Sequence, residues 1–329
     1  MSKTSSNVTE FRNGKEVAKP ISHELEPLTV VDLHRFLKME IPPRLRLIDP
    51  WFPQQGLGMI YGWRGTGKTY MALSLAYAVA SGGSLLDWSI PEPAKVVYID
   101  GEMLAPTLQE RLSLITAGAD KAPEPGMFNL ITPDLQSRPM PNLAVLGGLA
   151  ALEQVIPKDT KLIIVDSLSS LVHSPEKEND AESWQSISEW AIGQRVAGRS
   201  VIFVHHAGKS GAQRGTSRRE DLLDSTLVLK PVVGHSAHTG AKFEIKLEKS
   251  RSRCPEFEEI EAELVPSKGG GVEWIYKTLE SSMGDKVYDL TDSGMKPWEV
   301  GKELGISKAT VYRWLSKRAG AGVVSLPEV

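Results

Sequence analysis

Apolar residues in this chain gather in short uninterrupted runs, at residues 96–100, 161–166 and 200–205, rather than in alternating patterns. The runs are separated by segments whose apolar positions recur at helical spacing. Strands that are apolar on both faces are typical of a parallel sheet covered by helices on both sides. The pattern therefore predicts an α/β fold built on a mainly parallel sheet that is flanked by helices.

The same pattern divides the chain into three parts. Residues 1–28 are polar without periodicity and are expected to form a flexible tail, residues 29–277 the α/β domain, and residues 278–329 a small all-α module. We expect helices at 28–39, 70–80, 106–117, 143–155 and 181–197, and another strand at 128–131. Later strands, expected to extend the sheet in antiparallel fashion, are at 227–229, 243–247, 257–264 and 272–275.

Composition narrows the class of protein. The 329 residues carry a formal net charge of −3, so any contact with nucleic acid needs a local basic patch. One cysteine, Cys254, excludes an internal disulfide framework. The polar N-terminus has no signal core, and no apolar run is long enough to span a bilayer. We expect a soluble, cytoplasmic protein without a membrane partner.

The most informative segment is Gly62-Trp63-Arg64-Gly65-Thr66-Gly67-Lys68-Thr69, between an apolar strand and a helix that begins near Tyr70. Glycines let the backbone N–H groups turn inward toward a phosphate, and the start of the helix adds partial positive charge. Lys68 can reach the terminal phosphates, and the Thr69 hydroxyl can hold Mg²⁺. Residues 62–70 are therefore predicted to bind ATP with Mg²⁺.

Two more carboxylates at strand ends complete a candidate catalytic site. Asp166 closes an apolar strand, and we expect it to support Mg²⁺ together with Thr69. Glu102 follows the strand that ends at Asp100, and could activate the attacking water. Asp100 is the competing base; the longer side chain of Glu102 favours Glu102.

Together with residues 204–209 and 214–217, these motifs resemble the RecA-fold ATPases, and more narrowly the RepA-like replicative helicases of plasmids and phages. The similarity covers about residues 40–230. It implies a ring-forming ATPase, usually hexameric, that acts on DNA and shares each nucleotide between neighbouring subunits.

The resemblance also implies roles for particular residues. Lys68 and Glu102 would be catalytic, His206 would sense the terminal phosphate, and Arg214 would act as an arginine finger in the neighbouring site. Arg218 and Arg219 are alternatives for the finger. Lys209, Arg218 and Arg219 would belong to a loop that contacts DNA in the centre of the ring.

The C-terminal segment 296–315 resembles a helix-turn-helix. Gly305 permits a tight turn, Ser307 caps the second helix, and that helix carries Lys308, Arg313, Lys317 and Arg318 without an acid. Lys308, Arg313 and Lys317 are candidate DNA contacts. The alternative is a helical pair that only packs against the rest of the chain or against partners. Replicative helicases of this type generally lack the module.

The sequence thus predicts a DNA-associated ATPase motor of the RepA-like helicase type, acting in the replication of a plasmid, phage or other mobile element. The alternative is an ATP-dependent DNA-binding regulator or loader without processive unwinding. A third interpretation is a signalling ATPase that does not use DNA.

Overall fold

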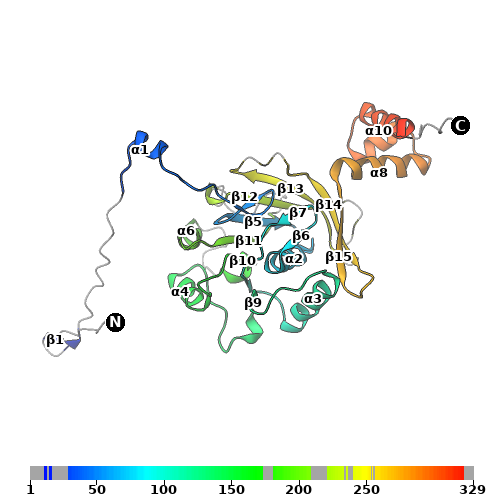
Figure 1. The fold of residues 1–329 in the computed structure, drawn as a ribbon. Helices are drawn as coiled ribbons and strands as arrows, with labels where there is room; N and C mark the ends of the chain where they lie inside the picture. The colour runs from blue at the N-terminus through cyan, green and yellow to red at the C-terminus, as the bar shows by residue number, and fades with distance from the viewer. Residues whose placement is uncertain are drawn as a thin grey trace. The chain divides into compact units, whose positions relative to one another are not determined.

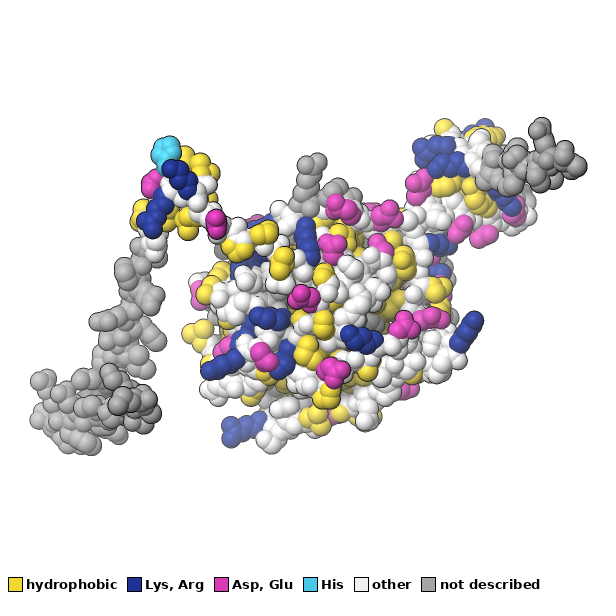
Figure 2. Space-filling model, in the orientation of Figure 1, with side chains coloured by type: hydrophobic (Ala, Val, Ile, Leu, Met, Phe, Trp, Pro, Cys, Tyr) yellow, Lys and Arg dark blue, Asp and Glu magenta, His cyan; other side chains and the backbone are white. Residues whose placement is uncertain are grey.

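The computed structural model describes residues 11–12, 15–16, 29–172, 181–208, 221–232, 235, 240–252, 254 and 256–321. The chain forms two compact units, residues 1–43 and 44–329. In the first, β1 (Phe11–Arg12) pairs with β2 (Lys15–Glu16), and α1 spans Leu33–Leu37. Helix α1 is shorter than predicted, and its apolar residues Leu33, Phe36 and Leu37 are exposed. Figure 2 shows hydrophobic side chains at the surface of this helix.

The second unit is built on a nine-stranded sheet, counted over the described residues, in the order β15-β14-β13-β12-β5-β11-β10-β8-β9 (Figure 1). Its strands from β12 to β9 are mutually parallel. They are β5 (Leu57–Gly62), β8 (Val96–Asp100), β9 (Phe128–Ile131), β10 (Leu162–Asp166), β11 (Ser200–His206) and β12 (Ser225–Pro231). The predicted mainly parallel sheet is therefore confirmed.

Three antiparallel strands extend the sheet: β13 (Lys242–Ser250), β14 (Ile260–Pro266) and β15 (Val272–Thr278). The prediction for residues 227–229 was wrong in one respect. They lie in β12, which runs parallel to β5 and antiparallel to β13. An apolar run shows that a strand is buried but not which way it runs, so the change of direction falls one strand later than expected.

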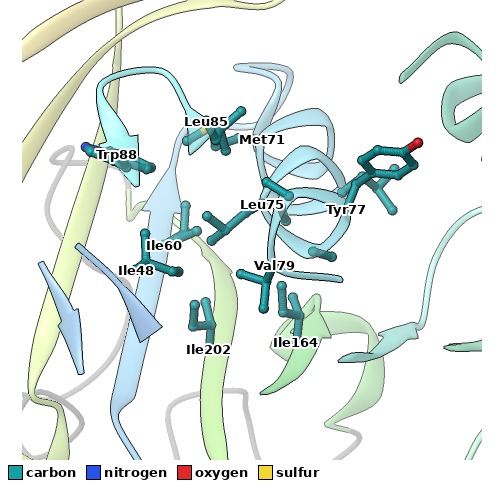
Figure 3. Close-up of a cluster of buried hydrophobic side chains, with 14 of the residues drawn as sticks. Ile48, Ile60, Met71, Leu75, Tyr77, Val79, Leu85, Trp88, Ile164 and Ile202 are labelled. Carbon is teal, nitrogen blue, oxygen red and sulfur yellow. The ribbon is translucent and has the colours of Figure 1, made fainter. Parts of the chain in front are cut away.

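Helices cover both faces of the sheet. On one face lie α2 (Lys68–Ser81) and α3 (Ala105–Gly118); on the other lie α4 (Leu146–Val155), α5 (Leu168–Leu171) and α6 (Ala181–Val196). Successive residues of one strand face opposite cores: Ile202 packs with α2, and Phe203 with Trp184 of α6. Figure 3 shows Leu75 and Val79 of α2 packed among Ile60, Ile164 and Ile202 of the sheet.

Some short elements were not predicted. They are β3 (Arg46–Ile48) paired with β4 (Phe52–Pro53), β6 (Gly83–Leu85) paired with β7 (Trp88–Ile90), and the 3₁₀ turn η1 (Pro133–Leu135). Trp51 and Trp88 are fully buried, and their ring centroids are 5.4 Å apart. Strands of two or three residues show too few alternations to be recognised from sequence.

After β15 the chain is helical, as predicted, with α8 (Leu279–Asp292), α9 (Pro297–Leu304) and α10 (Lys308–Ala321). These helices pack against one another around Val287, Val300, Val311 and Trp314. Helix α8 is joined to the sheet through Glu261 of β14, whose Oε2 accepts hydrogen bonds from Ser282 and Lys286. Over the described residues, the structure contains no helix of the length and apolarity that crossing a membrane requires.

Candidate nucleotide site

Four neighbouring strands end at one edge of the sheet and carry the predicted site residues. Gly62 ends β5, His206 ends β11, Asp166 ends β10 and Asp100 ends β8, and these strands are adjacent in that order. Ligands of open α/β sheets bind outside the carboxyl ends of the strands. The fold therefore brings together residues that are up to 144 positions apart in sequence, at Gly62 and His206.

The phosphate loop joins β5 to α2 in the predicted order of strand, loop and helix. Gly65 and Gly67 have φ of 77° and 96°, the left-handed region that a side chain disfavours. A Cβ added at Gly67 would lie 2.4 Å from the Cβ of Ala241, so the loop also needs glycine because it passes close to the segment before β13. The first backbone N–H groups of α2 have no carbonyl partner within the helix, and Lys68, Thr69 and Tyr70 at its start line the cleft.

Lys68 is buried at the start of α2, with 6% of its surface exposed. Burial lowers the pKa of its ammonium to about 8, although the nearby carboxylates of Asp166 and Glu102 act to raise it. Its Nζ donates to the carbonyl oxygen of Trp63 at 2.6 Å, and the Thr66 hydroxyl donates to the same oxygen. An ammonium has three donors, so Lys68 retains capacity for phosphate oxygens in the cleft.

Asp166 lies next to the first turn of α2. Its carboxylate accepts hydrogen bonds from the hydroxyl of Tyr98, at 2.6 Å, and from the hydroxyl of Thr69. Burial raises the pKa of Asp166, and these two hydrogen bonds act in the opposite direction. The structure thus brings together the predicted Mg²⁺ pair, Thr69 and Asp166. Hard oxygen donors of this kind suit Mg²⁺, which keeps several waters and takes further oxygens from phosphates.

Asp100 and Glu102 are placed differently, although only Gly101 separates them in sequence. Asp100 is buried, and its carboxylate accepts from the backbone N–H groups of Glu102 and Met103 and from the Thr132 hydroxyl. Burial raises the pKa of Asp100. Glu102 is exposed to the cleft, with the Ser167 hydroxyl 3.4 Å from its Oε2. Asp100 therefore orders the turn, and Glu102 is the more exposed of these two carboxylates, which both line the cleft.

His206 pairs in register with Gly62, the first residue of the phosphate loop, and lines the same cleft. The next residue, Ala207, donates its N–H to the carbonyl of Gly62 at 2.9 Å. The preceding residue, His205, is 2% exposed and belongs to the interior. Of the two histidines, His206 is therefore the one whose position suits a phosphate contact.

The cleft in front of the phosphate loop has a volume of about 730 Å³. Pockets of this size accommodate a nucleotide-sized ligand. One wall comes from residues that the sequence did not indicate. Arg111 of α3 lies over the ring of Tyr70 at 4.6 Å from its centroid. The rest of this wall is apolar and comes from the antiparallel strands and the segments beside them: Gly240, Ala241, Leu264, Val265, Pro266 and Val272.

Other predicted residues are not part of the cleft as described. Lys209, Arg214, Arg218 and Arg219 lie outside the described residues. Lys308, Arg313 and Lys317 lie on α10. Within the phosphate loop, the Arg64 side chain lines the cleft, whereas Trp63 is 45% exposed and contributes its carbonyl group.

Comparison with known proteins agrees with this geometry. The family model described as AAA domain matches residues 21–212, more than half of the chain. The chain belongs to this AAA domain family. Among solved structures it is similar to a KaiC-like protein of the hyperthermophilic archaeon Pyrococcus horikoshii OT3, at 15% identity and a TM-score of 0.48. That match covers 71% of this chain and 99% of the other, and it is too distant to carry a functional argument.

This AAA domain protein is a P-loop ATPase in class. Family and geometry agree on nucleotide use, because the glycine-rich loop, Lys68 and the Thr69–Asp166 pair meet at one edge of the sheet. Thr69 and Asp166 are the residues that would hold Mg²⁺, which neutralises phosphate charge in such sites.

Proposed function

We propose that this AAA domain protein is an ATP-hydrolysing motor of the RepA-like helicase type, which acts on DNA during replication of a plasmid, phage or other mobile element. The observation that carries the ATP hydrolysis in this proposal is the position of Glu102, while the DNA-associated role rests on the resemblance of the sequence motifs. Glu102 faces the cleft beside Lys68, while Asp100 is engaged in ordering the turn. A site for nucleotide binding alone would not need a carboxylate directed toward the phosphate end of the cleft.

The chain's own residues divide the work of hydrolysis. Lys68 and the loop amides bind the phosphate tail, and Arg64, which also lines the cleft, adds positive charge beside them. Glu102 accepts the proton of the attacking water as the bond to the terminal phosphate breaks. His206 hydrogen-bonds an oxygen of the terminal phosphate. When hydrolysis removes this phosphate the hydrogen bond is lost, and this change acts on the segment that follows β11. That segment includes Lys209, the proposed DNA contact.

The proposal includes a ring, usually hexameric, in which Arg214 of one subunit completes the site of the next. An arginine supplied by a neighbour raises hydrolysis rates by about 10³- to 10⁵-fold in other nucleotide hydrolases. Arg218 and Arg219 remain alternative fingers.

A mixing experiment tests the shared site. Arg214→Ala and Lys68→Ala proteins are each expected to be inactive as ATPases, and mixtures to regain activity, because some sites then combine an intact loop with an intact finger. The mass of the assembly is measured with and without a non-hydrolysable ATP analogue. A protein that stays monomeric with the analogue, or mixtures that stay as inactive as the two single variants, would overturn the shared site. An Arg214→Ala protein that hydrolyses ATP at the wild-type rate would exclude Arg214 and leave Arg218 and Arg219 as the candidate fingers.

A second candidate function is a DNA-binding regulator or loader whose assembly state is set by nucleotide. It is favoured by the C-terminal helices, which have their own apolar core around Val300 and Trp314. A forked duplex with one labelled strand distinguishes the two functions. ATP-dependent strand release supports the motor. Tight duplex binding with ATP hydrolysis but without strand release supports the regulator.

A further inference from the structure

Helices α9 and α10 are joined by a short turn with a fixed geometry. Gly305 ends α9 with φ 66° and ψ 26°, and Ile306 donates its N–H to the carbonyl of Gly301 at 2.9 Å. A Cβ at Gly301 would lie 2.8 Å from the carbonyl oxygen of Ile306, so the chain turns back closely on α9. The Ser307 hydroxyl accepts from the N–H of Thr310 at 3.1 Å, as a helix N-cap does.

The packing of α10 determines which of its faces is buried. Val311 and Trp314 are buried, and Leu315 packs against the same cluster. Gly284 of α8 allows this packing, because a Cβ there would lie 2.9 Å from the Trp314 ring. Residues at spacings of three and four share a helix face, so α10 is held by this inner side and cannot rotate without losing its core contacts.

The opposite face of α10 is exposed. It consists of residues at the same helical spacing, which we call the outer stripe: Ala309, Tyr312, Arg313 and Ser316. Tyr312 is 49% exposed, and the Nζ of Lys308 lies 5.7 Å from the centroid of its ring. The stripe combines one small residue, two hydroxyl groups and one guanidinium, with no carboxylate anywhere in α10.

The four cations of α10 fall into two groups. Lys317 and Arg318 are directed back to α8, where they pair with Glu280 at 2.6 Å and Asp292 at 2.8 Å. Arg313 lies on the outer stripe and has no salt bridge to any described residue, although its charge contributes to the lowered pKa of Glu280. Lys308, in the first turn of α10, also has no salt bridge to any described residue. The ion-paired cations are thus engaged with α8, while Arg313 and Lys308 remain available to a polyanion. Figure 2 shows Lys and Arg side chains at the surface of these helices.

We infer that α9 and α10 bind duplex DNA, with the outer stripe of α10 in the major groove. The inference rests on the proposed DNA-associated function and specifies the form of DNA and the contacting face. The major groove is about 12 Å wide and admits a helix, and arginine pairs there with guanine through two hydrogen bonds. In helix-turn-helix proteins the first turns of the second helix contact the bases, and the outer stripe begins in the first turn of α10.

Charge explains why the contact is confined to this face. The chain carries a net charge of −3, whereas α10 carries four cations and no acid. Attraction to phosphates therefore comes from a local group of cations rather than from the protein as a whole. Lys308 is placed to contact a phosphate at the side of the groove, while Arg313 specifies sequence.

The experiment uses the full chain. A random 24-bp duplex pool is enriched on the wild-type protein, and affinities are then measured for the recovered duplex, a scrambled duplex and the single strand. We expect Arg313→Ala to weaken binding of the recovered duplex by about 10-fold or more, and to reduce discrimination against the scrambled one. Lys317→Ala is the matched control, because it removes the same charge from α10 at a position outside the stripe.

Tyr312→Ala is a second stripe variant, and circular dichroism establishes that each variant is folded. The inference is overturned if both stripe variants discriminate as well as wild type does, or if the wild-type protein prefers the single strand to the recovered duplex. ATP hydrolysis is measured on the same samples. Loss of discrimination with unchanged ATPase activity supports the inference, whereas a wild-type protein that binds the duplex but does not hydrolyse ATP contradicts only the proposed motor.

Discussion

Charged groups are held in contrasting ways in the nucleotide cleft and in the C-terminal helices. In the cleft, Lys68 and Asp166 are buried. Burial lowers the pKa of Lys68 and raises the pKa of Asp166, and so favours the neutral form of each. In the helices, Glu280 and Asp292 are exposed, and hydrogen bonds from Lys317 and Arg318 lower their pKa values. Water screens the second set, so its pairs add little to stability. The cleft instead holds groups whose charged forms a ligand would stabilise: a bound phosphate would stabilise the Lys68 ammonium, and its metal ion the Asp166 carboxylate.

Within the cleft, the neighbouring carboxylates of Asp100 and Glu102 also differ, because Asp100 is buried and Glu102 is exposed. Glu102→Gln is the variant expected to have the largest effect on ATP hydrolysis. Because the amide cannot accept a proton from water, turnover should fall by about 10²- to 10⁴-fold. ATP affinity should stay close to that of wild type, since Glu102 is exposed and does not order the loop. Steady-state hydrolysis and equilibrium titration measure the two quantities. Hydrolysis at the wild-type rate would make Asp100 or another residue the base.

Lys68→Ala should have the next largest effect. Loss of one partner from a desolvated charge interaction costs about 2–5 kcal/mol, so ATP binding should weaken by about 30-fold to 4,000-fold. Lys158→Ala is the matched control, because that lysine is exposed in the segment before β10, which begins at the opposite edge of the sheet. Calorimetric titration with ATP compares the two variants. Unchanged affinity in Lys68→Ala would refute the assignment of the phosphate loop.

The lowered pKa of Lys68 predicts a moderate dependence of affinity on pH. Only the ammonium form attracts phosphates, and in the protein without nucleotide this form is lost as pH rises through about 8. Above that pH, binding must first restore the proton, so affinity falls. Between pH 7.5 and 9 we expect roughly tenfold weaker ATP binding. Constant affinity over this range would show that Lys68 keeps its proton in the empty cleft.

Lys317→Ala should have the smallest effect of the four predicted changes. It breaks the pair with Glu280, but both partners are exposed to solvent. We expect a thermal unfolding midpoint and an ATP hydrolysis rate indistinguishable from wild type. A clear drop in the midpoint would mean that the ion pairs of the C-terminal helices contribute more to stability than their exposure implies.

Much of the fold could be predicted from sequence, because continuous apolar runs such as that of β10 require burial on both faces. The phosphate loop and the carboxylates at the strand ends were found for the same reason, since each follows a recognisable strand. The direction of β12 was not predicted correctly, because its burial on both faces is compatible with either direction.

The cleft wall could not be predicted. Arg111 lies over Tyr70 only because α3 packs beside α2, and no local pattern around either residue indicates the contact. Ala241 and Leu264 reach the cleft through the register of β13 and β14. Such placements depend on pairings between distant segments, which hydrophobic periodicity does not specify.

The close approach of Gly67 to Ala241 has a practical consequence for dissecting the protein. The family match ends at residue 212, whereas the surface that supports the loop from outside begins at Gly240 and continues to Val272. A fragment trimmed to the matched region would keep every motif residue of the loop and lose the support on which the loop rests. The shortest fragment that retains a complete nucleotide cleft must therefore include strands β13 and β14 and the first residue of β15.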